Sequence, residues 1–229
     1  MLGERGMGGV SQAAWVRSLS STFFGTGRGG GRNGLFQANL LISGEPLEWT
    51  RPQQAAFLIQ LWVDLEEAVA EYPDHWWIRS YDKDPIRAVR DKTSMLNQDM
   101  GVRPLLAVAN EVFFENAELW RLHSWDVGPG DDDAGETAEV SAALESLRGA
   151  TFSRHLKELA KGLARFDWRS ADGPGVSADQ EEVQIRKRAY RGSGGYSQLR
   201  LDVLRAVSDL PDSQSATTAA ELVRRETAE

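Results

Sequence analysis

The feature that most constrains the fold is a run of apolar residues at helical spacing between Thr50 and Tyr72. Thr50 is a suitable N-cap, Pro52 fits the first helical turn, and Pro73 ends the pattern. A helix with such an apolar stripe must be covered by other parts of the chain. The stripe consists of Leu58, Leu61, Trp62, Leu65, Val69 and Tyr72.

Several other segments repeat this periodicity. We expect a short helix at 11–20 capped by Ser11, another at 85–90, and a helix pair on either side of Gly149. A second strong helix is expected at about 103–122, after a break at Gly101 and with Pro104 in its first turn. Its buried face would consist of Leu105, Val108, Ala109, Val112, Phe113, Leu119 and Trp120.

No segment shows the sustained apolar/polar alternation of a half-buried strand. The sequence therefore predicts a mainly α protein with a helical, bundle-like body. Short strands near 35–42 and 183–190 remain an alternative for those two segments.

Glycine-rich and acidic stretches divide the sequence into four parts. Residues 1–34 are expected to be an N-terminal helix with a flexible glycine-rich linker, and 35–125 a helical domain. We interpret the segment DVGPGDDDAGE at 126–136 as an acidic linker. Residues 137–229 would then form a C-terminal helical region that carries a basic segment.

Composition excludes several classes of site. The chain has no cysteine, which removes disulfides, zinc–thiolate centres and cysteine nucleophiles. No window approaches the about 20 apolar residues needed to cross a bilayer, and the first ten residues lack the apolar core of a secretory signal. A cytoplasmic location is the resulting expectation.

The three histidines, His75, His123 and His155, do not fall at metal-ligand spacing with one another or with a carboxylate. No acid, base and nucleophile set converges in the sequence. We expect no metal and no cofactor, and a non-catalytic role is favoured over an enzyme.

The stretch FFGTGRGGGRNGLFQ at 23–37 matches G-x-G-x-x-G at Gly25, Gly27 and Gly30. A nucleotide-binding loop needs a strand before it and a βαβ unit around it, and the neighbouring pattern is helical. We interpret the stretch as a linker, with a phosphate cradle as the alternative. Arg28 and Arg32 are candidate phosphate contacts, because guanidinium groups suit phosphate geometry.

The segment IRKRAYRGSGGYSQLRLDVLR at 185–205 reverses the charge of an otherwise acidic chain, whose formal net charge is −8. Cations, glycines and tyrosines together suit the backbone and bases of a nucleic acid. A solvated turn before a helix is the alternative. The predicted nucleic-acid contacts are Arg186, Lys187, Arg188, Tyr190, Arg191, Tyr196 and Arg200.

The pair Trp76–Trp77 lies in an expected loop between helices. Core packing is the favoured role for such a pair. One ring could fill the core while the other stacks on the base of a partner.

Several segments, taken in order, resemble the C-terminal part of the DGQHR-domain family, which is similar to the ParB-type fold and includes the repressor-like protein of DNA phosphorothioation systems. They are FLIQLWVDLEEAV, KDPIRAVRDKTSMLNQDMGVRPLLAVANEV with Lys92 and Thr93, ARFDWRSAD with Asp167 and Trp168, and RAYRGSGGYSQLRLDVL. The resemblance covers about residues 20–205. The Asp-Gly-Gln-His-Arg signature and the α/β portion around it are absent, which implies a shortened or split member.

This resemblance implies a bacterial or mobile-element protein that works near DNA, as a regulator or defence accessory. We therefore expect a non-catalytic, DNA-associated accessory or regulatory protein. A protein-interaction or oligomerisation module, with a partner protein or a second copy covering apolar helix faces, is the alternative. A nuclease-like enzyme is the third hypothesis.

Overall fold

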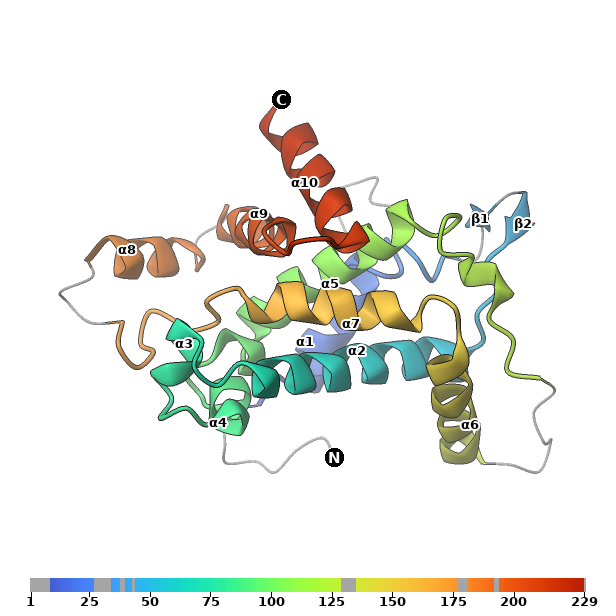
Figure 1. Cartoon of the computed structure of the whole chain (residues 1–229), viewed down its shortest axis with the longest axis horizontal. Helices are drawn as coiled ribbons and strands as arrows, with labels where there is room; N and C mark the ends of the chain where they lie inside the picture. The colour runs from blue at the N-terminus through green and yellow to red at the C-terminus, as the bar shows by residue number, and fades with distance from the viewer. Residues whose placement is uncertain are drawn as a thin grey trace.

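A computed structural model describes residues 9–26, 34–37, 40–42, 44–128, 135–176, 181–191 and 194–228. The described chain is mainly α-helical, as the sequence predicts (Figure 1). Its α-helices are α1 (Gln12–Ser21), α2 (Arg51–Glu71), α3 (Trp76–Arg79), α4 (Pro85–Arg90), α5 (Asp99–Glu115), α6 (Glu136–Gly149), α7 (Ser153–Ala164), α8 (Glu181–Ala189), α9 (Gly195–Ser208) and α10 (Gln214–Thr227). Two 3₁₀ turns, η1 (Met95–Asn97) and η2 (Leu122–Ser124), flank α5.

The predicted capping signals form the expected contacts. The Thr50 hydroxyl accepts from the Gln53 amide, and the Gln53 side chain accepts from the Thr50 amide, which makes a complete capping box at α2. Ser11 caps α1 by accepting from the amide of Ala14. Residues 85–90 form α4 with the predicted bounds.

One short hairpin is present in the described chain, with β1 (Leu41–Ile42) antiparallel to β2 (Glu45–Pro46). It overlaps the segment 35–42, for which the sequence allows a short strand. The alternative of a strand near 183–190 is wrong, because residues 183–189 belong to α8 and a turn follows at Tyr190.

The second strong helix begins earlier and ends earlier than predicted. Gly101 does not break the chain but lies in the first turn of α5, where the carbonyl oxygen of Met95 approaches so closely that a Cβ would sit 2.1 Å from it. Pro104 is therefore inside the helix rather than at its start. The helix ends before Asn116, so Leu119 lies outside it and is exposed, whereas Trp120 is buried.

A single cluster of buried apolar residues runs from Phe23 to Ala219. In Figure 1, α2 and α7 lie side by side across the middle of the molecule, and α9 and α10 cover one side together with α5. Helix α2 packs against both α6 and α7, which come after the predicted acidic linker in the sequence. The core is therefore shared between the two helical parts of the sequence.

The chain on the two sides of residues 27–33 is joined by packing. The rings of Phe23 and Phe36 stack with centroids 4.6 Å apart, and the Phe36 amide donates to the Phe23 carbonyl at 2.9 Å. A Cβ at Gly34 would lie 2.2 Å from that carbonyl oxygen, so this approach requires glycine. Arg28 and Arg32, and two of the three glycines of the G-x-G-x-x-G match, lie outside the described residues.

Within the described residues, the helices are too short or too polar to cross a membrane.

Candidate functional site

A cleft of about 620 Å³ lies at the end of the helical body, where α8 and α9 face the segment that follows α7. Trp76 of α3 also lines it, together with Arg165, Phe166 and Asp167. Figure 1 shows α8 projecting beyond the packed helices on the same side as α3. The cleft therefore joins three parts of the sequence that are far apart in the chain.

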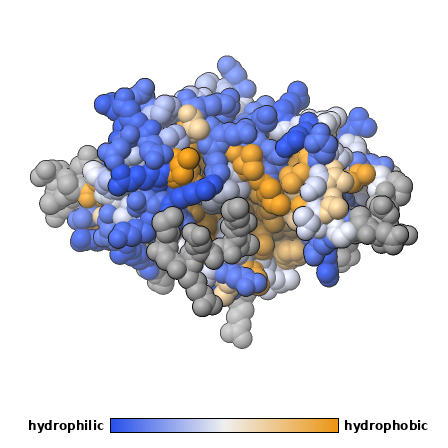
Figure 2. All heavy atoms as spheres, turned by 90° about the horizontal axis from the view of Figure 1, so that it is seen from below, coloured by the Kyte–Doolittle hydropathy of each residue, from blue (hydrophilic) through white to orange (hydrophobic). Residues whose placement is uncertain are grey.

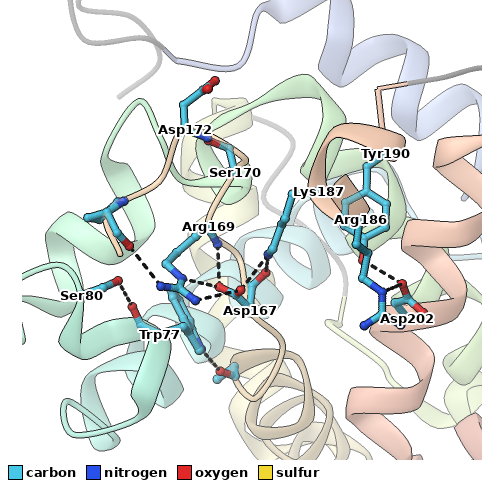
Figure 3. Close-up of polar contacts among 12 residues, drawn as sticks. Trp77, Ser80, Asp167, Arg169, Ser170, Asp172, Arg186, Lys187, Tyr190 and Asp202 are labelled. Atoms are coloured by element: carbon cyan, nitrogen blue, oxygen red, sulfur yellow. Dashed lines mark hydrogen bonds and ion pairs between the residues drawn. The ribbon is translucent and has the colours of Figure 1, made fainter. Parts of the chain in front are cut away.

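The base of the cleft is built on the buried carboxylate of Asp167. Arg169 donates to it twice, from Nε at 2.9 Å and from a terminal nitrogen at 3.2 Å. The Lys187 ammonium lies 3.0 Å from the same carboxylate and also donates to the Asp167 carbonyl. Figure 3 shows the two cations approaching the carboxylate from different sides.

Backbone pairing holds the Asp167 segment in place. Ser94 and Arg169 form an isolated antiparallel bridge, with the Met95 amide donating to the Trp168 carbonyl and the Ser170 amide donating to the Thr93 carbonyl. The structure thus places the segments around Thr93 and Trp168 side by side, although about 75 residues separate them in the sequence.

A second carboxylate, Asp202 of α9, lies on the other side of the cleft. Tyr190 donates its hydroxyl to Asp202 at 2.7 Å, and Arg205 donates at 2.8 Å. The guanidinium of Arg186 lies 3.8 Å from the same carboxylate (Figure 3). Asp202, like Asp167, is therefore shared between two cations.

This sharing leaves the base of the cleft with four cations against two carboxylates, a formal excess of two positive charges. Arg165 adds one more cation, while exposed Glu182 and Asp209 add two carboxylates to the lining. The residues that line the cleft then carry four cations and four carboxylates, and the buried guanidinium of Arg169, which lies against Trp76, adds one positive charge at its base.

Burial perturbs the titrating groups at this site. It lowers the pKa of Lys187 to about 8, although neighbouring Asp167 opposes the shift. Burial, together with the bond to Asp202, raises the pKa of Tyr190, so its hydroxyl keeps its proton and acts as a donor. Burial and nearby Arg165 lower the pKa of His75, which precedes Trp76. At pH 7 the cleft therefore holds a protonated lysine and a neutral tyrosine.

The two adjacent tryptophans take different positions. Trp77 is fully buried and donates its indole N–H to the Ala164 carbonyl at 3.0 Å. Trp76 is 56% exposed and lines the cleft, with the Arg169 guanidinium carbon 4.8 Å from its ring centroid. The favoured role of core packing thus holds for Trp77 and not for Trp76.

The predicted basic segment does not present one outward-facing surface. Lys187, Tyr190 and Arg200 are buried, each bonded to a carboxylate, so they are not free to contact a nucleic acid in this conformation. The physical reason is that successive helical residues point about 100° apart, so neighbouring cations on α8 point in different directions.

Arg200 lies away from the cleft, where it joins Glu111 of α5 at 2.5 Å and Glu226 of α10. Tyr196 is half-buried, and its hydroxyl donates to the Arg103 carbonyl at 3.4 Å. The guanidinium of Arg103 lies over the Tyr196 ring.

Arg186, Arg188 and Arg191 are exposed, which a phosphate contact requires. Arg191 forms a 2.7 Å ion pair with Asp172. Arg165 and Arg205, which also line the cleft, were not among the predicted contacts. Arg205 lies within the basic segment, but nothing in the sequence around Arg165 distinguishes it from other surface arginines.

Across the described ranges, no group of three or more histidine, aspartate or glutamate side chains is arranged to hold a metal ion. His155 is buried and stacks on Trp120 with centroids 4.1 Å apart. Comparisons of the chain with protein-family models, with curated proteins and with solved structures give no match.

Proposed function

We propose that the chain is a non-catalytic, DNA-associated accessory or regulatory protein that contacts nucleic-acid phosphates through the cleft between α8, α9 and the Asp167 segment. The observation that carries the proposal is the sharing of two buried carboxylates among four cations. An incoming phosphate would accept from the guanidinium N–H groups that the two buried carboxylates leave unused.

The arginines at the mouth of the cleft are the proposed contacts. Arg186 and Arg205 are exposed, and each contacts Asp202 through one nitrogen, so their remaining N–H groups are available to a second anion. Arg165 lines the same space, and exposed Arg188 extends the positive surface along α8. Lys187 and Arg169 would act from below, by supplying charge rather than direct contact.

The resemblance to the DGQHR-domain family supports the same proposal. Two of the segments that carry it, around Thr93 and around Asp167, pair with each other beside the base of the cleft. We extend the proposal to a role in a bacterial or mobile-element system that acts on or near DNA, such as defence.

A salt series of DNA binding tests the proposal. Fluorescence anisotropy with a labelled oligonucleotide would be measured for the wild type and for Arg186→Gln/Arg205→Gln. The double variant should bind more weakly, and the slope of log affinity against log salt should fall by about 0.7–0.9 for each lost phosphate contact. An unchanged slope, or no binding by the wild type at low salt, would overturn the proposal.

Two matched controls sharpen the test. Arg148→Gln removes an exposed arginine of α6 that pairs with Glu145, and it should leave the slope unchanged. Glu182→Gln removes a rim carboxylate of the cleft and should strengthen binding, because it removes repulsion of the phosphate. Opposite effects of the glutamate and arginine variants would locate the binding site in the cleft.

A protein-interaction module is a second candidate, and exposed apolar residues favour it. Figure 2 shows apolar side chains gathered in the middle of one face of the molecule. Ile59 and Val63 are exposed one turn apart on α2, where Trp62 contacts Trp15 of α1, and Val16 of α1 is also exposed. Sedimentation at several concentrations would test it: self-association that Ile59→Asp abolishes supports it, and a monomer throughout contradicts self-association.

A further inference from the structure

The conspicuous unexplained feature of the cleft is the exposed ring of Trp76. Single exposed apolar side chains are normal on protein surfaces and need no explanation. Trp76 differs because it lines a concave site together with three arginines, and because a buried cation, Arg169, lies against its ring. Both features point to a ring that is held in place for a partner.

The position of the ring follows from the residue beside it. Trp77 is anchored in the core by its indole bond to Ala164 and by an edge-to-face contact with Tyr81. Because α3 is helical, the side chain that precedes Trp77 must point in a different direction. The buried tryptophan thereby directs Trp76 toward the cleft.

The support behind the ring is rigid. Arg169 is only 3% exposed, and its guanidinium is held by two bonds to Asp167 and one to the Pro174 carbonyl at 3.1 Å. This fixed guanidinium lies against the Trp76 ring at cation–π distance. The exposed part of the indole is thus a preformed stacking platform with little freedom to lose on binding.

A flat aromatic surface next to arginines suits a base and its flanking phosphates. Stacking on tryptophan requires a base whose face is free, which a single strand offers and the interior of a duplex does not. The cleft volume of about 620 Å³ falls within the range of sites that hold small ligands, so it can admit an unpaired nucleotide.

We propose that Trp76 stacks on an unpaired base of a single-stranded nucleic acid, while Arg186 and Arg205 contact the phosphates beside that base. This inference rests on the proposed function and narrows its ligand from DNA in general to an unpaired strand. Because every base has an aromatic face, the contact is tolerant of sequence.

The test compares three probes of equal length: a single strand, the same strand with abasic positions, and a blunt duplex. The wild type should bind the intact single strand most tightly. Trp76→Ala should weaken that binding about tenfold, Trp76→Phe should weaken it less, and neither should change the salt slope. Leu119→Ala, which removes another exposed apolar side chain outside the cleft, should have no effect.

The abasic strand separates stacking from a general loss of structure. It should bind the wild type about as weakly as the intact strand binds Trp76→Ala, and Trp76→Ala should not distinguish the two strands. Equal affinity of the wild type for intact and abasic strands would overturn the stacking inference.

The arginine double variant distinguishes failure of the stacking inference from failure of the proposed function. If Arg186→Gln/Arg205→Gln lowers the salt slope while Trp76→Ala changes nothing, the proposed function stands and the stacking inference is wrong. If the wild type binds none of the probes at low salt, both are wrong. Thymidine monophosphate that binds as tightly as the strand would overturn the choice of a strand as the ligand.

Discussion

Arg200 provides the sharpest test of how the basic segment is used, because the structure turns a predicted phosphate contact into a structural ion pair. The side chain is 1% exposed and joins Glu111 of α5 at 2.5 Å and Glu226 of α10. Three helices therefore meet at one guanidinium. We expect Arg200→Met to destabilise the fold.

The magnitude follows from the burial of the partners. The Glu111 side chain is 13% exposed, so removal of the arginine leaves a poorly hydrated carboxylate without the cation it contacts. Breaking a buried pair from one side costs about 3–5 kcal/mol. Because a whole domain is stable by about 5–15 kcal/mol, this loss would be a large fraction of the total.

Urea denaturation followed by circular dichroism measures the effect. A matched control is Arg225→Met, which removes an exposed ion pair with Glu115 that also joins α10 to α5. That exposed pair should contribute at most about 1 kcal/mol. The double variant Arg200→Met/Glu111→Leu should recover part of the lost stability, because no buried charge then lacks its partner.

The reasoning would be refuted if Arg200→Met cost no more than Arg225→Met. It would also be refuted if Arg200→Met unfolded at the wild-type midpoint but lost DNA affinity with a smaller salt slope. That second result would restore Arg200 as a phosphate contact.

Three further predictions concern pH and packing. Lys187 has a folded-state pKa of about 8 against its ordinary 10.5, so between these pH values the unfolded chain binds more protons than the folded chain. The stability of the wild type should therefore rise with pH over this interval. Lys187→Met should lack that rise, as measured by urea denaturation. Burial raises the pKa of Asp64 above its ordinary 3.8, so the folded chain binds that proton more tightly than the unfolded chain. Stability should therefore fall as the pH rises above 3.8, and Asp64→Asn should show a smaller fall. Gly101→Ala should lower the thermal midpoint, because its Cβ would lie 2.1 Å from the Met95 carbonyl oxygen, whereas Gly149→Ala, which meets nothing within 4 Å, should raise it slightly.

Local signals in the sequence predicted the helices well. A capping residue, a proline in the first turn and an apolar stripe together define α2, because each acts within a few residues of itself. The helix containing Pro104 begins earlier than predicted, and Gly101 lies inside it because the absence of a side chain allows the close approach of Met95, which spacing does not reveal. Leu119 was predicted to lie on a buried face because the predicted helix ran past Glu115, where α5 ends.

The site was predicted only in part, because its partners come from distant segments. Positive charge at 186–191 was visible in the sequence, but whether each cation faces solvent or a buried carboxylate depends on how α8 packs. Lys187 meets Asp167 and Arg200 meets Glu111, at separations of 20 and 89 residues. The sequence shows which charges lie close together along the chain, whereas the fold determines which of them are paired with an opposite charge.

The stacked rings of Phe23 and Phe36 have a consequence for how this protein could change over time. The core fixes the chain at both of these phenylalanines. For any chain segment held at both ends, the entropy of closure depends only weakly on the number of residues between them. Doubling a closed loop costs about 0.6 kcal/mol, far less than the packing on either side contributes. Evolution or an engineer could therefore lengthen the sequence between these two phenylalanines, for instance to insert a reporter domain, without rebuilding the helical body.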